Sequence, residues 1–226
     1  MKRNWLSLLF CVLFSTALAQ TEIGPVNWTK IEKVISTHPD SVRMLIERLA
    51  TPDTELTLSW EERRMAFYGQ ALMTKNREDY TVKRAEKAFE KGSYREAVQL
   101  AKDALRTNPL CLTALRIAEK GTQELIDAGS PDHYAADVKR YSERAFRLYN
   151  IIASTGDGSK KQPFCVTKKA DEYNFMRYYL EQWEYVGQSM IGTCDVIELK
   201  EPNQYYARKS IWFDAYLTFK TESLNN

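Results

Sequence analysis

Apolar residues recur at helical spacing through the first two thirds of the chain. Between about residue 27 and residue 155 they fall three or four positions apart, which is typical of amphipathic helices that pack against a core. Residues 20–155 are therefore predicted to form a helical region. The predicted helices cover residues 28–35, 43–49, 60–72, 112–126 and 134–151.

A helical hairpin is predicted inside this region. Ala85 and Ala88 lie on one face of a first helix, and a second helix ends at Pro109. Small alanines let antiparallel helices approach closely, while Gly92 permits the turn between them and Pro109 stops the second helix. Residues 92–109 resemble the second half of a tetratricopeptide repeat. Because stacked repeats need about three units for stability, the hairpin is expected to belong to a local bundle.

The pattern changes after residues 156–162, which have the composition of a linker loop. Residues 163–226 are rich in aromatic side chains, and strands are predicted at 164–167, 194–199 and 210–215. Residues 171–180 favour a short helix, with a strand as the alternative. The predicted fold class is α+β: an N-terminal helical bundle that contains the tetratricopeptide-like hairpin, followed by a small antiparallel β-sheet packed on the helices.

Residues 1–19 have the pattern of a secretory signal peptide. Lys2 and Arg3 supply the positive start, an apolar run of about ten residues follows, and Ala17-Leu18-Ala19 is a small-x-small cleavage site. That run is too short to cross a bilayer, which takes about 20 residues. The mature chain is expected to be exported to the periplasm or the extracellular space without a transmembrane anchor.

The charge balance excludes one class of partner. The chain has 32 basic and 30 acidic residues, and loss of Lys2 and Arg3 with the signal peptide leaves the two signs equal. A neutral chain has no overall field with which to attract a polyanion, so nucleic acid is not an expected partner.

Motifs for nucleophilic, metal or cofactor chemistry are weak. The only histidines are His38 and His133, and Gly187-Gln188-Ser189-Met190-Ile191 lacks the second glycine of a nucleophile elbow. No cysteine and histidine spacing indicates zinc, and no cofactor is expected. Cys165 and Cys194 lie in predicted strands of an exported chain, where they either form a disulfide or remain two buried thiols.

Acidic and aromatic residues of the C-terminal part are the remaining candidates. A glycosidase-like enzyme needs two carboxyl groups about 5–9 Å apart across a cleft, although acids at helix caps and strand ends are also common for structural reasons. Flat aromatic rings either stack on a sugar or pack in a core. The candidate site comprises Asp171, Glu172, Tyr173, Asp195 and Asp214, and the candidate stacking residues are Tyr178, Tyr179, Trp183, Tyr185, Tyr205, Tyr206 and Trp212.

Three separated segments carry a distinctive order of short motifs. They run from Leu45-Ile46-Glu47-Arg48-Leu49 to Phe67-Tyr68-Gly69, from Pro163-Phe164-Cys165-Val166 to Asp171-Glu172-Tyr173, and from Gly187-Gln188-Ser189 through Cys194-Asp195 to Ile211-Trp212-Phe213-Asp214. In this order they resemble an uncharacterised family of exported proteins from Gram-negative gut bacteria, a domain of unknown function. The resemblance implies export and an α+β fold, and it brings no catalytic residues.

Two hypotheses about function follow. The first is a non-enzymatic exported module that binds a protein or another envelope component, a glycan included, with the C-terminal sheet as the contact surface. The alternative is a hydrolase that acts on glycan or peptide through the C-terminal carboxylates. A cleft that gathers those acids would favour the hydrolase, whereas a closed surface that scatters them would argue against it.

Overall fold

The computed structural model describes residues 24–130 and 135–225. The predicted signal peptide and His133 lie outside these residues. The described helices are α1 (Trp28–Thr37), α2 (Pro39–Ala50), α3 (Trp60–Thr74), α4 (Asp79–Glu90), α5 (Tyr94–Thr107), α6 (Leu112–Asp127), α7 (Ala135–Ala153), α8 (Lys169–Tyr178) and α9 (Tyr216–Asn225). The described strands are β1 (Phe164–Cys165), β2 (Tyr185–Ile191), β3 (Cys194–Leu199) and β4 (Ser210–Asp214). A helical region followed by a small sheet confirms the predicted α+β fold class.

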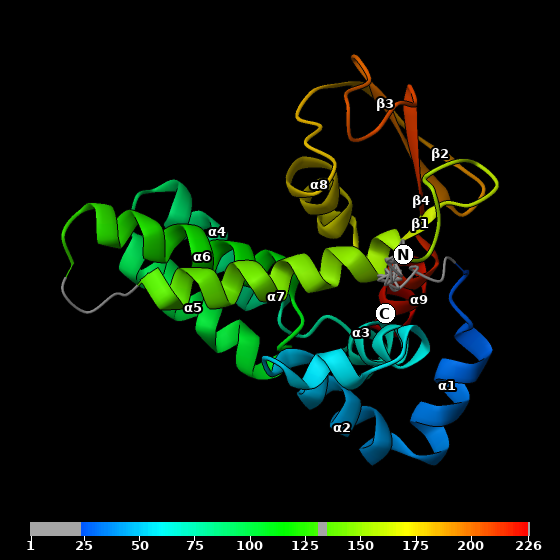
Figure 1. Cartoon of the computed structure of the whole chain (residues 1–226), viewed down its shortest axis with the longest axis horizontal. Coiled ribbons are helices and arrows are strands. Elements are labelled where there is room, and N and C mark those ends of the chain that lie inside the picture. Colours follow the sequence, from blue (N-terminus) through cyan, green and yellow to red (C-terminus); the bar gives the residue numbers. More distant parts are fainter. Residues whose placement is uncertain (1–23, 131–134, 226) are drawn as a thin grey trace, which may run out of the picture.

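The helical hairpin is confirmed as α4 and α5. Gly92 adopts a φ of 73° in the turn, a conformation that glycine takes without strain. The amides of Gly92 and Ser93 donate to the carbonyls of Phe89 and Ala88, which closes the end of α4. Helices α6 and α7 continue the series, and each packs on the helix before it. The four helices α4, α5, α6 and α7 are called the arm (Figure 1).

The sheet has the strand order β1-β4-β3-β2. Strands β2, β3 and β4 are antiparallel neighbours, but β1 pairs with β4 in parallel, so the sheet is mixed and not antiparallel throughout as the sequence predicted. The reason is the connection: the chain leaves β1, passes through α8 and the β2–β3 hairpin, and returns beside β1 in the same direction. Such a crossover produces a parallel pair, whereas tight hairpins produce antiparallel ones.

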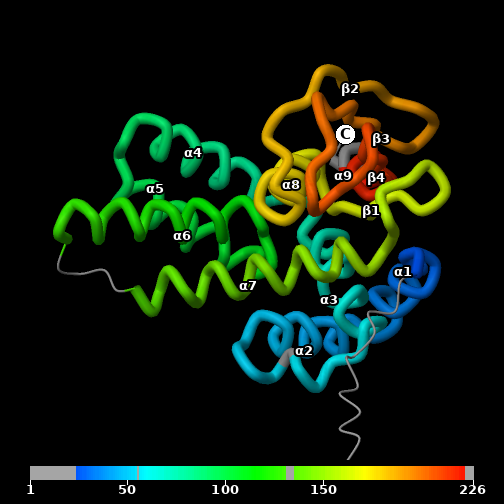
Figure 2. The backbone as a smooth tube through the Cα atoms, turned by 45° about the horizontal axis from the view of Figure 1, so that its top comes forward, coloured from blue at the N-terminus to red at the C-terminus, as the bar shows by residue number. Residues whose placement is uncertain are grey.

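Helix α8 covers one face of the sheet and joins it to the arm. Phe175 of α8 contacts Phe164 of β1 and Phe213 of β4 edge to face, with ring centroids 4.8 and 6.3 Å apart. All three rings are buried and belong to a core cluster that continues into the helical region. Figure 2 shows α8 between the sheet and the arm. The two parts therefore share one core.

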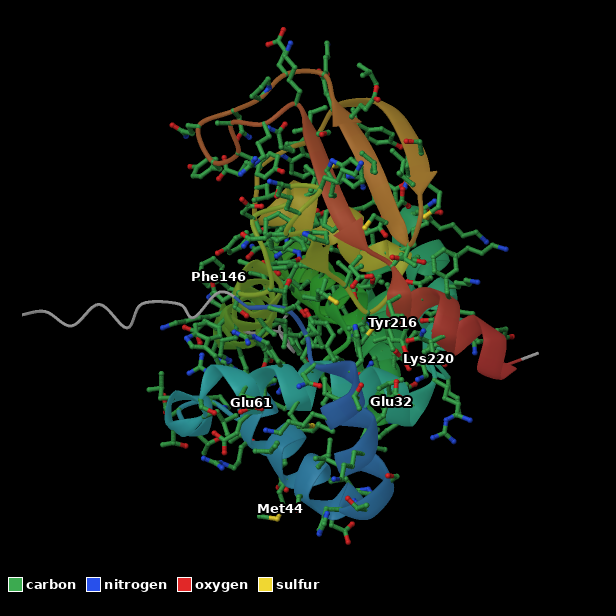
Figure 3. The ribbon with its side chains drawn as sticks, turned by 90° about the vertical axis from the view of Figure 1, so that its right-hand side faces the viewer. Glu32, Met44, Glu61, Phe146, Tyr216 and Lys220 are labelled. Carbon is green, nitrogen blue, oxygen red and sulfur yellow. The ribbon has the colours of Figure 1, made fainter. Side chains whose placement is uncertain are left out.

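The last helix returns to the first. Trp28 of α1 and Tyr216 of α9 lie with ring centroids 5.1 Å apart. Glu32 of α1 accepts hydrogen bonds from the Tyr216 hydroxyl and from Nζ of Lys220 (Figure 3). Neither α9 nor strand β2 was among the predicted elements, and both lie in the sheet-containing part.

Residues 156–162 form an irregular segment that is attached to the sheet. The carbonyl of Gly158 accepts hydrogen bonds from the Trp212 amide and the Tyr206 hydroxyl, both at 2.9 Å. Gly158 has a φ of 72°, and a Cβ there would lie 2.6 Å from Cε2 of Phe164. A side chain at this position would clash with the Phe164 ring. Glycine therefore allows the backbone of residues 156–162 to approach the sheet closely.

Within residues 24–130 and 135–225, no helix combines the length and apolar character that crossing a membrane requires.

Candidate functional site

Two of the predicted acids meet between α8 and the sheet. Glu172 lies in the first turn of α8, Asp195 lies on β3, and their side chains are within hydrogen-bonding reach of each other. Both residues are buried, with exposed fractions of 1% and 4%. The pKa of Glu172 is raised to about 9. Burial of its carboxyl group is the main cause, and the neighbouring Asp195 carboxylate adds to the rise. Burial therefore favours the protonated form of Glu172 beside the Asp195 carboxylate.

Tyr173 joins this pair through a glutamine. Its hydroxyl donates to Oε1 of Gln188 on β2 at 2.5 Å, and Nε2 of Gln188 donates to Oδ2 of Asp195 at 2.6 Å. The exposed Lys169 lies 3.9 Å from the same carboxylate oxygen. The network thus connects α8 to β2 and β3, and it satisfies an acid that would otherwise be buried without partners.

Asp171 has a different set of partners from Glu172 and Asp195. Its carboxylate accepts a hydrogen bond from Oγ1 of Thr167, and burial raises its pKa to about 6 against the opposing effect of Lys168. Lys168 itself is nearly buried, and its Nζ lies 2.5 Å from Oδ1 of Asp79 and 3.3 Å from Oε1 of Glu78. Lys168 therefore forms ion pairs with two acids at the start of α4, and its charge also acts on the carboxylate of Asp171.

The electrostatics of Lys168 depend on this surrounding. Burial by itself would lower its pKa, but the Cys111 thiol and the carboxylates of Asp171, Glu78 and Asp79 together raise it well above the usual range. Glu78 has no exposed side-chain surface and also accepts a hydrogen bond from Asn108 at 2.8 Å. Sequence patterns do not predict this ion cluster, because Glu78 and Lys168 are 90 positions apart.

Asp214 is not part of the acid network. It pairs in register with Cys194, whereas Asp195 pairs with Phe213, so the side chains of Asp214 and Asp195 lie on opposite faces of the sheet. The carboxylate of Asp214 accepts a hydrogen bond from the Tyr216 amide at 3.0 Å, at the start of α9. Its structural role is to cap that helix.

The cysteines are too far apart for a disulfide. Cys165 on β1 and Cys194 on β3 both have Asp214 of β4 as their register partner, so β4 lies between them. Two strand spacings separate their Cα atoms by roughly 10 Å, whereas a disulfide requires less than about 7 Å. Both are free thiols whose pKa values are raised by burial, so the disulfide considered from the sequence is not formed.

The geometry of the acid pair does not suit hydrolysis. A hydrolytic pair flanks the scissile bond, with about 5–9 Å between the two carboxyl groups. Glu172 and Asp195 instead contact each other, and their burial leaves no room for a substrate between them. The structure thus brings Glu172, Tyr173 and Asp195 together, but as an internal network.

A cavity of about 380 Å³ lies on the arm side of α8. Lys168, Lys169 and Ala170 form one wall, α4 forms another, and Thr218 and Thr221 of α9 close it. Asp79, Lys83 and Glu86 all line the α4 wall, so charged groups of both signs border the cavity. Among the described residues, no group of histidine, cysteine and acidic side chains has the arrangement of a metal site.

The candidate stacking aromatics have different environments. Tyr206 is buried, and Tyr179 stacks on Phe175 with ring centroids 4.9 Å apart. Trp183 and Tyr205 are the most exposed of the group, at 56% and 52%. Several of these rings therefore contribute to the core and its rim, as ordinary packing requires.

The most open surface of the sheet is strand β2, which no predicted element covered. It is the edge strand of the sheet, and it exposes Val186, Met190 and Ile191 by 68%, 50% and 47%. An edge strand presents unpaired backbone N–H and C=O groups to its surroundings. The apolar residues among 185–191 were the sequence feature that could have indicated a strand. Because both faces of β2 are exposed, apolar and polar residues do not alternate along it, and that alternation is how half-buried strands are recognised.

Comparison with protein families identifies the family of this chain. A family model described as a domain of unknown function, DUF4919, matches residues 29–222. The chain belongs to the DUF4919 family. The match begins in α1 and ends in α9, so the arm and the sheet of this DUF4919 domain belong to one family unit. No curated protein and no solved structure matches this DUF4919 domain.

Proposed function

We propose that the chain is an exported, non-enzymatic binding module of the cell envelope that takes up an extended segment of a protein along the edge of β2. The signal-peptide pattern of residues 1–19 supports export. In this mode of recognition a partner strand adds to the sheet through main-chain hydrogen bonds, and side chains of the edge strand provide selectivity.

One observation carries the proposal. Strand β2 is seven residues long, contains no charged residue and no proline, and exposes apolar side chains beside an unpaired backbone edge. Natural edge strands usually carry lysine, proline or another device that blocks further pairing. In the described strand the bulge between Tyr185 and Gly187 is the one device of this kind, so the regular stretch from Gly187 to Ile191 remains open to pairing.

The interior of the fold is consistent with a rigid support for that edge. The contacts of Gln188 with Asp195 and of Asp195 with Glu172 connect β2 and β3 to α8. The ion pair of Lys168 with Asp79 connects the start of α8 to α4. A preorganised strand loses little conformational entropy when a partner strand binds. The buried acids thus stabilise the position of the proposed binding surface relative to α8.

Site-specific photo-cross-linking in cells tests the proposal. A photoreactive residue in place of Met190 should give a discrete covalent adduct in the envelope fraction, because this side chain lies on the free edge. The same residue in place of Leu56, which is 73% exposed on the short turn between α2 and α3, is the matched control and should give no such adduct.

A second variant makes the test specific for strand addition. Val186→Asp in the Met190 cross-linking chain should abolish the adduct, because a charged edge residue disfavours pairing. Labelling that is equal from both positions, or that persists with Val186→Asp, would argue against the edge as the binding surface.

A further inference from the structure

The cavity between α4, α8 and α9 has the size of a small-molecule site. Its volume of about 380 Å³ lies within the roughly 300–1,000 Å³ that such sites usually have. The residues that line it come from α4 and the turn before it, from the start of α8, and from α6 and α9. Among the described residues of β2, none lines this cavity. The cavity is therefore a second surface, separate from the edge that is proposed to bind a strand.

One acid of the cavity wall lacks a counter-ion. Glu86 of α4 is partly buried, and its carboxylate forms no ion pair or hydrogen bond with the described part of the chain. Burial raises the pKa of Glu86, and the neighbouring carboxylate of Glu90 adds to the rise. The charge of Lys168 acts on Glu86 in the opposite sense, but Lys168 already forms ion pairs with Glu78 and Asp79. A ligand with an ammonium group would supply the missing positive charge.

Two lysines of the wall are available for a carboxylate. Lys83 lies on α4 one turn before Glu86, is exposed, and forms no ion pair within residues 24–130 and 135–225. Lys169 at the start of α8 is 60% exposed, and its contact with Oδ2 of Asp195 is 3.9 Å long. Their ammonium groups belong to two different walls of one cavity. A carboxylate that lies between them would accept charge-assisted hydrogen bonds from both.

The wall also contains hydrogen-bonding groups that the fold leaves unused. Nδ2 of Asn76 donates to Oγ1 of Thr221 at 3.1 Å, so Oδ1 of the same amide remains as an acceptor. That Oδ1 atom and Oγ1 of Thr218 are buried, and neither has a hydrogen-bond partner in the described part of the chain. Buried polar atoms in native folds are almost always satisfied. A polar ligand at this end of the cavity would provide the missing partner.

Ligands with a single charge fit this wall poorly. A simple anion would meet the acids Asp79 and Glu86, and a simple cation would meet Lys83 and Lys169. A neutral sugar would leave the carboxylate of Glu86 without a cation. A small molecule that carries both charges a few bonds apart matches the two signs of the wall.

We propose that this cavity binds a free aliphatic α-amino acid. Glu86 accepts hydrogen bonds from the ammonium group of the ligand, and Lys83 and Lys169 donate to its carboxylate. Val82, which is 5% exposed, and Ala170 are the apolar residues of the wall and contact the ligand side chain. This site goes beyond the proposed function of β2 and does not depend on it.

Titration of the purified chain with leucine, followed by nuclear magnetic resonance, tests the proposal. We expect saturable binding with a Kd of about 1 mM or tighter, which a ligand of this size can reach. Isocaproate lacks the ammonium group of leucine and isoamylamine lacks its carboxylate, so each should bind roughly tenfold more weakly. Glycine has both charges but no side chain to contact Val82, so it should also bind more weakly than leucine.

Two substitutions assign the charges. Glu86→Gln should weaken leucine binding by roughly tenfold and leave isocaproate binding unchanged, because isocaproate has no ammonium group. Lys83→Met should weaken leucine binding in the same way and leave isoamylamine binding unchanged, because isoamylamine has no carboxylate. A folding defect would weaken the binding of leucine and analogue alike, so the pattern distinguishes the two causes.

The next turn of α4 provides matched controls. Lys87 and Glu90 are exposed and do not line the cavity. Lys87→Met and Glu90→Gln should therefore leave leucine binding unchanged. Thermal midpoints of all variants, measured without ligand, show whether each chain folds.

Three results would overturn the proposal. They are the absence of saturable leucine binding up to about 10 mM, equal affinities for leucine and either analogue, and equal losses in Glu86→Gln and Glu90→Gln. Equal affinities for leucine and isocaproate would identify a site for simple anions. The Met190 adduct in cells is measured separately, so failure of the amino-acid site would leave the proposed function of β2 standing.

Discussion

Lys168→Met is expected to lower the free energy of unfolding by about 3–5 kcal/mol, because removal of one partner from a buried ion cluster leaves uncompensated charge. The cluster would retain Glu78, whose side chain has no exposed surface, and Asp171, which is 1% exposed. Methionine fills a similar volume, so the loss would reflect charge and not a cavity. Urea unfolding at neutral pH measures the effect.

A matched control isolates burial as the cause. Lys200 pairs with Glu184 on the surface, and their side chains are 58% and 69% exposed. Lys200→Met should therefore leave the free energy of unfolding nearly unchanged, because water screens an exposed ion pair. Adding Glu78→Gln to Lys168→Met should recover part of the loss, since it removes one unpaired charge. Equal effects of the two lysine substitutions would disprove the structural role of Lys168.

The stability of the unsubstituted chain should fall as the pH rises from about 5 to 8. The pKa of Glu172 is about 9 in the folded chain and 4.5 when unperturbed, so between these values the folded chain binds more protons than the unfolded chain. Stability then decreases with pH, by up to about 1.4 kcal/mol for each pH unit. Asp171, with its pKa raised to about 6, contributes in the same direction at the acidic end.

Glu172→Gln should remove most of this dependence above pH 6. The glutamine stays neutral and can still donate to Asp195, so the variant should be more stable than the unsubstituted chain at pH 8 by roughly 2–4 kcal/mol. Glu198→Gln, at an exposed position of the same sheet, is the control and should retain the full slope. Urea unfolding across the pH range would refute the buried pair if the Glu172→Gln and unsubstituted curves ran parallel.

The helices could be predicted because their signal is local. Within each helix the buried apolar side chains, such as Leu49 in α2 and Leu115 in α6, recur every three or four residues. The same periodicity is visible in the sequence. Strand β2 lacked such a signal, because its apolar residues are exposed on both faces. Its identity as a strand comes from pairing with β3, which is a tertiary interaction.

The acids could be named from the sequence, but their environment could not. Glu172 meets Asp195 only because α8 packs on the face of β3 from which Asp195 projects. The register of β4 places Asp214 on the other face, and a shift of one residue would have reversed that outcome. Burial then converts candidate catalytic groups into structural ones.

Hydrogen–deuterium exchange at β2 tests most directly whether this edge takes up a strand. The amides that point away from β3 should exchange rapidly in the purified chain and slowly in the Met190 cross-linked complex purified from cells. The amides bonded to β3 should stay protected in both conditions, so we expect an alternating pattern along 187–191. Exchange at the outward amides that does not change on association, while protection appears elsewhere on the chain, would contradict strand addition at β2.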